Sequence, residues 1–365
     1  MARFALSHDY GVGSILIVLG RLKLDSKKFC SLAHPAYLIG LVSLLWLTIC
    51  VGIFAQERPC TVEMPAIVAL PDATLVQRLA SDAFVAHLKK GPARIDGVIS
   101  DRGPRQILFV VETGKQIPPT VRKVEAEILT EILKNARPED SFALLTAHGQ
   151  RREVQFGTSK ETLKSTVEEI GVGASGKNEG NGVLDAIFEG IDWFRPHKAG
   201  DAVIVLTLAI ESNHQVSFTK VRDGLAKEGI HLFGFQLGPF FEGSYNAYLS
   251  TTPFGQLSLT GWFDPNRENL FALSRYTGGF VALENAEGDP QKEYHLTDQR
   301  LHAIRHAAQQ EYKAILEFYR IQVEGSANDL EIDLADSLRR KLPKAEVIYP
   351  RNSQSCLKVS ALAND

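Results

Sequence analysis

The sequence lacks the clustered metal ligands and basic patches that identify many functional classes. Its ten histidines are dispersed, and its four cysteines show no spacing typical of a zinc site. The formal net charge is -3, and no run of lysine and arginine is interleaved with aromatic residues, which argues against nucleic-acid binding. Hydrophobic residues make up 44% and charged residues 23% of the chain, as in an ordinary globular protein. Function therefore has to be inferred from the pattern of strands and loops.

One uncharged segment stands apart from the globular pattern. Residues 36–55 carry no charge over about the 20 residues that a bilayer requires. Basic residues precede this segment, so the leader 1–35 is expected to stay cytoplasmic and the rest to be exported. The segment is either a signal peptide, cleaved near Ala55-Gln56, or an uncleaved transmembrane anchor, and a buried core helix is the third reading. The protein is thus expected to be periplasmic, secreted or anchored by one N-terminal helix.

Cysteine usage fits this division of the chain. Cys30 and Cys50 lie in the leader and the apolar segment, whereas Cys60 and Cys356 lie on the exported side, where disulfides persist. Because the ends of a domain often lie close together, a Cys60–Cys356 disulfide is one alternative and two unpaired thiols are the other.

Unbroken apolar runs predict strands that are buried on both faces of a parallel sheet. The clearest runs are residues 107–111 and 202–207, with further strands predicted at 141–146, 152–156, 230–237 and 280–283. Apolar residues at helical spacing predict helices between these strands, at 118–133, 160–170, 183–194, 218–227 and 267–276. The alternation predicts an α/β fold with a doubly wound, mostly parallel sheet flanked by helices.

The ends of the exported part are assigned to smaller elements. Residues 56–72, punctuated by prolines, are interpreted as a linker, and residues 73–101 as a small N-terminal module. In this module, a partly helical stretch is predicted at 76–88 and a strand at 95–99. The central domain is expected at 102–285, and residues 286–365 are expected to form a helix at 295–310 and a C-terminal β tail with strands at 312–323, 330–334 and 345–349.

Three stretches of the predicted domain resemble a known family. Residues 112–117 read Glu-Thr-Gly-Lys-Gln-Ile, residues 180–186 read Gly-Asn-Gly-Val-Leu-Asp-Ala, and residues 206–209 read Leu-Thr-Leu-Ala. They resemble the von Willebrand factor A domain, which usually has Asp-Thr-Ser-Gly-Ser-Met, Gly-Gly-Thr-Ala-Leu-Tyr-Asp-Ala and Leu-Thr-Asp-Gly at these places. By order and spacing, residues 73–350 resemble the von Willebrand factor A related proteins abundant in acidobacteria.

The resemblance implies a degenerate metal-ion-dependent adhesion site. The five metal-coordinating positions of the family are occupied in this chain by Glu112, Gly114, Gln116, Asn181 and Leu208. Magnesium requires near-octahedral oxygen ligation, but two ligands are absent and amides replace the serine and threonine hydroxyls. No metal or other cofactor is therefore expected, and weak binding of Mg²⁺, Mn²⁺ or Ca²⁺ is the alternative.

The carboxyl edge of the predicted sheet also supplies candidate binding residues. These are Glu112, Thr113, Lys115, Gln116, Asn181 and Thr207, together with the aromatic residues Phe240, Phe241, Tyr245 and Trp262 of the loop 238–264. Lys115 either offers a cation to an acidic group of a partner or is an ordinary solvated lysine. The aromatic loop is either a recognition surface or a loop that packs on its own domain.

Nucleotide binding and catalysis are not supported by the sequence. The glycines of residues 171–182 resemble phosphate-binding motifs, but such motifs follow a strand, and here a helix is predicted before them. Glu112, His148 and Glu211 lie at predicted strand ends, without a nucleophile elbow or a pair of metal ligands.

The sequence thus predicts a non-enzymatic module for protein–protein interaction or adhesion on the exported side of a bacterial membrane. It would bind an unknown protein partner without the usual metal bridge, and would contact the membrane through residues 36–55 if these are uncleaved. The alternatives are divalent-metal-dependent adhesion through a rebuilt site, a structural envelope component and, more remotely, a hydrolase.

Overall fold

The computed structural model describes most of the chain between residues 61 and 351. The described residues are 61–70, 74–89, 91–115, 117–172, 181–198, 200–208, 214–237, 269–283, 298–324 and 330–351. All of them lie in the unit Pro59–Asp365. The predicted leader and apolar segment, residues 1–55, lie outside the described residues. Within the described ranges, no helix is long and apolar enough to span a membrane.

A six-stranded sheet forms the centre of an α/β domain. Its strand order is β10-β9-β8-β5-β6-β7, and all neighbours are parallel except the edge strand β7, which is antiparallel to β6. The strands are β5 (Gln106–Glu112), β6 (Ser141–Ala147), β7 (Glu153–Val154), β8 (Ala202–Thr207), β9 (His231–Gln236) and β10 (Val281–Leu283). Residues 107–111 of β5 have no exposed surface, which explains their unbroken apolar run. The predicted fold class is confirmed.

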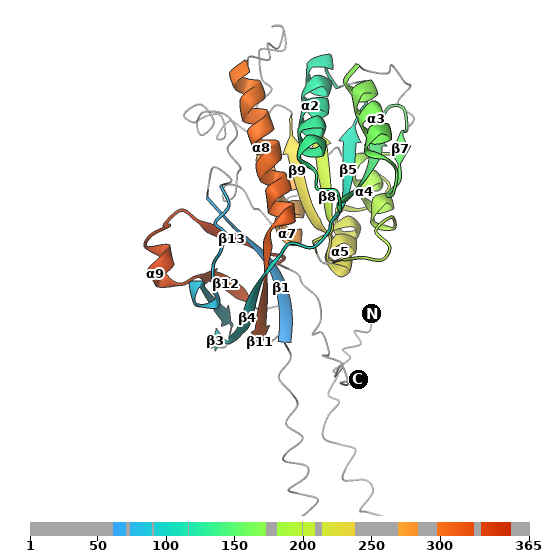
Figure 1. The fold of residues 1–365 in the computed structure, drawn as a ribbon. Coiled ribbons are helices and arrows are strands. Elements are labelled where there is room, and N and C mark those ends of the chain that lie inside the picture. Colours follow the sequence, from blue (N-terminus) through green and yellow to red (C-terminus); the bar gives the residue numbers. More distant parts are fainter. Residues whose placement is uncertain are drawn as a thin grey trace, which may run out of the picture. The chain divides into compact units, whose positions relative to one another are not determined.

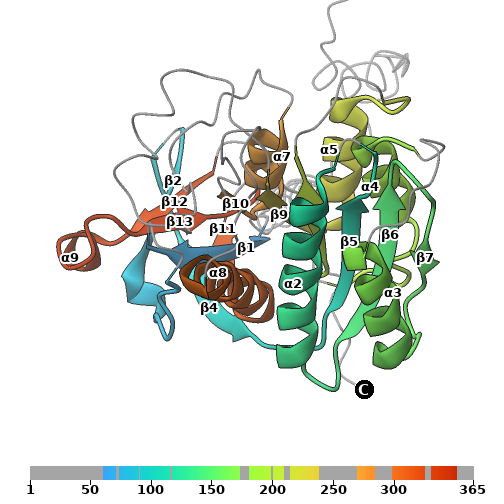
Figure 2. The same cartoon turned by 90° about the horizontal axis from the view of Figure 1, so that it is seen from above.

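Helices cover both faces of this sheet (Figures 1 and 2). On one face, α2 (Pro119–Asn135), α3 (Lys160–Val172) and α8 (Asp298–Leu316) share a core with Phe109 of β5. On the other face, α4 (Val183–Ile191), α5 (Phe218–Glu228) and α7 (Leu270–Thr277) share a core with Leu108. Successive residues of β5 therefore point into two different cores, as the two-residue period of a strand requires.

Strands from both ends of the described chain form a second part, which we call the β subdomain (residues 61–101 and 318–351). One of its sheets has the order β13-β1-β11-β4 and the other β12-β2-β3, and their apolar side chains share a core. Its elements are β1 (Thr61–Ala69), η3 (Ser81–Ala83), β2 (Phe84–Leu88), β3 (Gly91–Ala93), β4 (Ile95–Asp101), β11 (Phe318–Glu324), β12 (Glu331–Leu334), α9 (Asp336–Arg339) and β13 (Glu346–Ile348). The predicted N-terminal module and β tail are thus interleaved.

The predicted linker is wrong over most of its length, because Thr61–Ala69 is strand β1. Pro65 lies in the middle of this strand, opposite Arg320 of β11, whereas β13 pairs only with residues 67–69. Along this part of β1 only one side is paired to another strand, so a proline without an N–H is tolerated.

Two further local predictions are wrong. The stretch 76–88, predicted to be partly helical, contains only the three-residue η3 before β2, and β2 pairs with β3 and with the distant β12. Tyr312, predicted to begin a strand, lies in α8, and the strand begins at Phe318. Ile304, Ala308, Tyr312 and Ile315 continue the buried stripe of this helix.

A buried arginine connects the β subdomain to the central sheet. The Arg105 side chain is 2% exposed, and its guanidinium lies 4.7 Å from the ring centroid of Phe318 in β11. Its Nε donates to the Ile315 carbonyl at 3.1 Å, and its Nη2 lies 2.6 Å from Asp101 Oδ1. One side chain thus contacts α8, β4 and β11.

Asp140 anchors the same edge of the sheet. Its carboxylate accepts hydrogen bonds from the Arg105 N–H at 2.9 Å, from Arg137 Nη2 at 2.7 Å and from the Tyr312 hydroxyl at 2.6 Å. Burial alone would raise the pKa of Asp140, but these hydrogen bonds outweigh it and hold the pKa below its ordinary value. Asp140 is therefore a charged anchor between β5, the end of α2 and α8.

Candidate functional site

The carboxyl ends of β5 and β8 lie side by side where the resemblance places the metal-coordinating positions. Glu112 is the last residue of β5 and is 1% exposed. Its Oε2 accepts a hydrogen bond from the Thr207 hydroxyl at 2.6 Å and another from the Leu208 N–H at 3.0 Å. The glutamate therefore binds the end of the neighbouring strand, and its carboxylate is turned into the protein.

Backbone hydrogen bonds join the three loops around this edge. The Thr113 N–H donates to the Ala147 carbonyl at 2.8 Å, and the Thr113 hydroxyl donates to the His148 carbonyl at 3.1 Å. The His148 N–H in turn donates to the Asn181 carbonyl at 2.8 Å. Gly149, at φ +59°, lies so close that a Cβ would be 2.5 Å from the Thr113 carbonyl oxygen. The loops after β5 and β6 are thus fixed against each other and against the start of α4.

Asp185 joins two further segments at this edge, the start of α4 and the residues before α5, and we did not predict this role from the sequence. Its carboxylate accepts from the Gly182 N–H at 3.2 Å, from Gln215 N–H at 2.9 Å and from Val216 N–H at 2.7 Å. It therefore caps α4 and holds the segment before α5. An acidic residue three positions after the N-cap Gly182 is the sequence signal that predicts such a cap.

A second buried glutamate lies behind Glu112 and was also not predicted. Glu125 of α2 has no exposed surface, and neither of its carboxyl oxygens has a hydrogen-bond partner among the residues that the structure describes. Burial, and then the charge of Glu112, raise the pKa of Glu125 well above its ordinary value, whereas Arg122 opposes this change. Arg122 Nη2 donates to the Gly114 carbonyl at 3.3 Å, which places a guanidinium under the loop.

The predicted site residues are only partly brought together. Glu112 and Thr207 are in contact, Thr113 lies beside them, and Lys115 and Asn181 are exposed. Gln116, Glu211, the aromatic residues Phe240, Phe241, Tyr245 and Trp262, and the cysteines Cys60 and Cys356 lie outside the described residues. Their predicted roles, including the disulfide, stay predictions.

The described residues do not fit the metal that the resemblance implies. Leu208 packs against the hydrophobic core, Gly114 has no side chain, and Glu112 Oε2 already accepts two hydrogen bonds. No group of three or more His, Cys, Asp or Glu side chains within the described ranges is arranged to hold a metal ion. The donor set is thus poor in the hard oxygen ligands that magnesium requires.

Comparison with known proteins gives matches to solved structures only. The sequence matches no protein-family model and no curated protein. Proximal thread matrix protein 1 from the mussel byssus is similar over 68% of this chain, at 14% identity and a TM-score of 0.40, and the match spans 50% of the mussel protein. BatB from Bacteroides thetaiotaomicron is similar over 58% of this chain and 100% of its own, at 13% identity and a TM-score of 0.36.

A third match carries the family in its name. The von Willebrand factor type A protein from Catenulispora acidiphila is similar over 80% of this chain and 73% of its own, at 11% identity and a TM-score of 0.40. At these identities the likeness concerns the fold alone. The mostly parallel sheet with helices on both faces is the α/β architecture that the sequence predicts.

Proposed function

We propose that this protein is a non-enzymatic interaction module that binds another protein through the carboxyl edge of its central sheet, without a metal bridge. The single observation that carries the proposal is the position of Glu112, whose carboxylate is used inside the protein by Thr207 and Leu208. In a metal-dependent adhesion site, the corresponding carboxylate is needed to hold the cation. Here that carboxylate already accepts two hydrogen bonds within the protein, which supports a contact that needs no cation.

The proposed contact residue is Lys115, an exposed cation in the loop after β5. The Thr113 hydrogen bond and the Arg122–Gly114 contact hold the residues before Lys115, and the Ile117 N–H, after it, donates to the Gly114 carbonyl at 3.0 Å. A lysine on a fixed loop suits an acidic side chain of a partner, because little conformational entropy is then lost on binding. We further propose that the contact takes place on the exported side of the membrane, as the basic residues before 36–55 indicate.

Metal independence is tested by thermal unfolding of the full chain in chelator and then in millimolar Mg²⁺, Mn²⁺ or Ca²⁺. A cation at about 100 times its dissociation constant adds about 2.7 kcal/mol, equivalent to a rise of about 5–11 °C for a domain of this size. We expect a change of about 1 °C or less. A rise in the larger range that is lost in Glu112→Ala would instead support divalent-metal-dependent adhesion.

The contact edge is tested by placing a photo-crosslinking amino acid at position 115 in cells. We expect a discrete crosslinked protein that persists in chelator and is absent when the same amino acid replaces Lys341, an exposed lysine after α9. Lys115→Glu should weaken binding of the identified partner by about tenfold, since the charge at the contact is reversed. Equal crosslinking from both positions, or unchanged affinity of Lys115→Glu, would contradict the assignment.

A further inference from the structure

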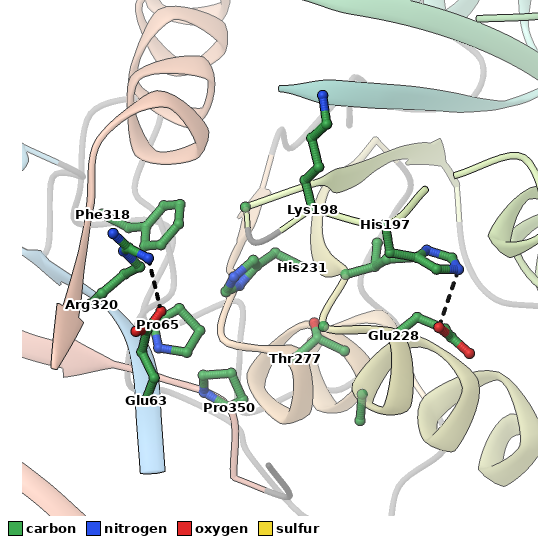
Figure 3. Close-up of a pocket in the computed structure, with 14 residues that line it drawn as sticks. Glu63, Pro65, His197, Lys198, Glu228, His231, Thr277, Phe318, Arg320 and Pro350 are labelled. Atoms are coloured by element: carbon green, nitrogen blue, oxygen red, sulfur yellow. Dashed lines mark hydrogen bonds and ion pairs between the residues drawn. The ribbon is translucent and has the colours of Figure 1, made fainter. Parts of the chain in front are cut away.

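A cavity of about 320 Å³ lies at the amino edge of the central sheet, and its acidic side chains are engaged within the protein (Figure 3). Glu63 of β1 lies 3.2 Å from Arg320 of β11, and Glu228 of α5 lies 3.1 Å from His197 Nε2. Each carboxylate thus has a partner from another segment of the chain. These contacts stabilise the wall of the cavity and do not indicate a ligand, whereas two histidines of α8 have a different arrangement.

The two histidines lie about one helical turn apart on the exposed side of α8. His302 and His306 are separated by four positions, and both are exposed. Residues at this spacing are neighbours on the helix surface, with Cβ atoms about 5–6 Å apart. Neither imidazole forms a hydrogen bond or an ion pair with another residue that the structure describes. Two imidazoles are therefore placed side by side with their ring nitrogens available.

The helix around this pair is held in place from its other side. Ile304 and Ala308 are buried in the core that α8 shares with the central sheet. Arg305, between the two histidines in the sequence, forms an ion pair with Glu127 of α2. The spacing of the imidazoles is thus set by a packed helix before any ligand binds, so little conformational entropy is lost on binding.

The charges of the described side chains of α8 allow a cation at the pair. The charge of Arg305 is balanced by Glu127, and Lys313 lies about 10 Å further along the helix axis from His306. Asp298, an exposed acidic residue, lies one turn before His302. It is about 12 Å along the axis from His306, so it adds negative charge near the pair but cannot bind one ion together with both histidines.

Two imidazoles at this spacing suit a divalent transition-metal ion. Imidazole nitrogen is a good ligand for Zn²⁺ and Cu²⁺, whereas Mg²⁺ and Ca²⁺ prefer oxygen. Histidines four positions apart on one face of a helix can reach a single zinc ion, as in the His-Glu-x-x-His motif. The pair therefore selects a different class of ion from the one that the adhesion site of the resembling family holds.

We propose that His302 and His306 together bind one divalent transition-metal ion, Zn²⁺ or Cu²⁺, on the surface of α8. The protein supplies two ligands, and water fills the other coordination positions. The site uses none of the residues of the proposed protein contact, and that contact needs no metal. The two proposals therefore fail independently.

The test is isothermal titration calorimetry of the full chain with Zn²⁺, in a buffer that contains millimolar Mg²⁺ throughout. We expect saturable binding with a dissociation constant below about 1 mM, unchanged when Mg²⁺ is left out, because magnesium does not compete for imidazole. Absence of Zn²⁺ binding up to about 1 mM, or its loss in the presence of Mg²⁺, would overturn the proposal.

Single variants locate the bound ion. His302→Gln and His306→Gln should each weaken Zn²⁺ binding by about tenfold or more, since losing a ligand costs at least as much as losing a residue that orients one. The matched control is His87→Gln, at an exposed histidine of β2, which should leave the affinity unchanged. Thermal unfolding checks that all variants are folded. Equal affinities of the wild type and the two α8 variants would refute the assignment.

A double variant tests the spacing itself. His306→Gln combined with Lys313→His keeps the number of histidines on α8 but places the second one about 16 Å from His302 along the helix axis. We expect this protein to bind Zn²⁺ as weakly as His306→Gln, because one ion cannot reach both rings. The electron paramagnetic resonance spectrum of bound Cu²⁺ should likewise show fewer coordinated nitrogens than in the wild type. Full affinity in the double variant would contradict chelation by the pair.

Discussion

The two edges of the central sheet use their polar residues in opposite ways. At the carboxyl edge, Glu112 and Asp185 accept hydrogen bonds from the end of β8, from the start of α4 and from the segment before α5. At the amino edge, Asp140 and Arg105 connect the sheet to α8 and to the β subdomain. The first set of contacts lies within the α/β domain, whereas the second joins that domain to the β subdomain.

This difference shows that topology alone does not locate a binding site. Open α/β sheets usually bind ligands at the carboxyl ends of their strands, yet here the carboxylates of Glu112 and Asp185 at that end are used inside the protein. The carboxyl edge still presents Lys115 and Asn181 to solvent, which suits contact with a protein surface better than enclosure of a small ligand. Fold similarity cannot choose between these uses, because one fold hosts many functions.

The largest change in the free energy of unfolding is expected for Asp140→Asn, at the amino edge of the sheet. The amide loses the negative charge that accepts from Arg137 and Tyr312. Removing one partner of a buried pair costs about 3–5 kcal/mol, so we expect the free energy of unfolding to fall by about 3 kcal/mol at pH 7. Denaturant unfolding of both proteins measures the difference. A change below about 0.5 kcal/mol, usual for an exposed position, would show that the amino edge is not anchored by this residue.

Acid should abolish the same difference. Because the pKa of Asp140 is lower in the folded than in the unfolded protein, its contribution is fully present above the unfolded value of about 4 and is lost as the pH falls through the folded value. The stabilities of the wild type and of Asp140→Asn should therefore converge below about pH 4. Parallel pH profiles would contradict this account.

The next effect concerns Glu125, behind the carboxyl edge. Its carboxyl group is buried, with no hydrogen-bond partner in the described part of the chain, and replacing a buried charged group by an apolar one of similar size often stabilises a protein by about 1–4 kcal/mol. We expect Glu125→Leu to raise the free energy of unfolding by about 2 kcal/mol and Glu125→Gln to raise it less, since the amide is still polar. A loss of stability in Glu125→Leu would mean that the carboxyl group has a partner in the folded protein.

The smallest effect is expected for Thr207→Val, which keeps the shape of the side chain and removes the hydroxyl that donates to Glu112. The free energy of unfolding should fall by about 1–2 kcal/mol, because a buried carboxylate loses one donor. Thr162→Val, at an exposed threonine of α3, is the matched control and should change stability by less than about 0.5 kcal/mol. Equal changes in the free energy of unfolding of the two variants would show that the Thr207–Glu112 hydrogen bond does not stabilise the carboxyl edge.

The central sheet was predictable because its sequence signal is local. The run from Ile107 to Val111 and that from Ala202 to Leu206 are apolar without interruption, and both strands are buried on both faces. The apolar stripe of α2, with Val121, Val124 and Ile128, also predicted correctly which face of this helix is buried. Such patterns depend only on the period of the element and on burial.

The β subdomain and the side-chain contacts at the carboxyl edge of the central sheet were not predictable in the same way. Strand β1 contains Pro65, and its partner β11 lies more than 250 positions away, so no local pattern marks the pairing. Glu125 lies on the apolar stripe of α2 but reads as an ordinary surface glutamate in the sequence. The sequence alone showed that positions 114 and 208 carry no side chain able to bind magnesium. The hydrogen bond from Thr207 to Glu112, in contrast, depends on side-chain positions that only the folded sheet defines.

The pairing of β1 with β11 also orders the events of synthesis. Thr61, one of the first described residues to leave the ribosome, stands opposite Glu324, one of the last. Residues 106–283, which contain all six strands of the central sheet, are complete before β11 exists. Since domains generally fold as units and from the N-terminal side during synthesis, β1 has to wait as an unpaired apolar strand while the α/β domain forms. Among the strands that the structure describes, β1 is made first and pairs with β11 and β13, which are made near the end of the described chain.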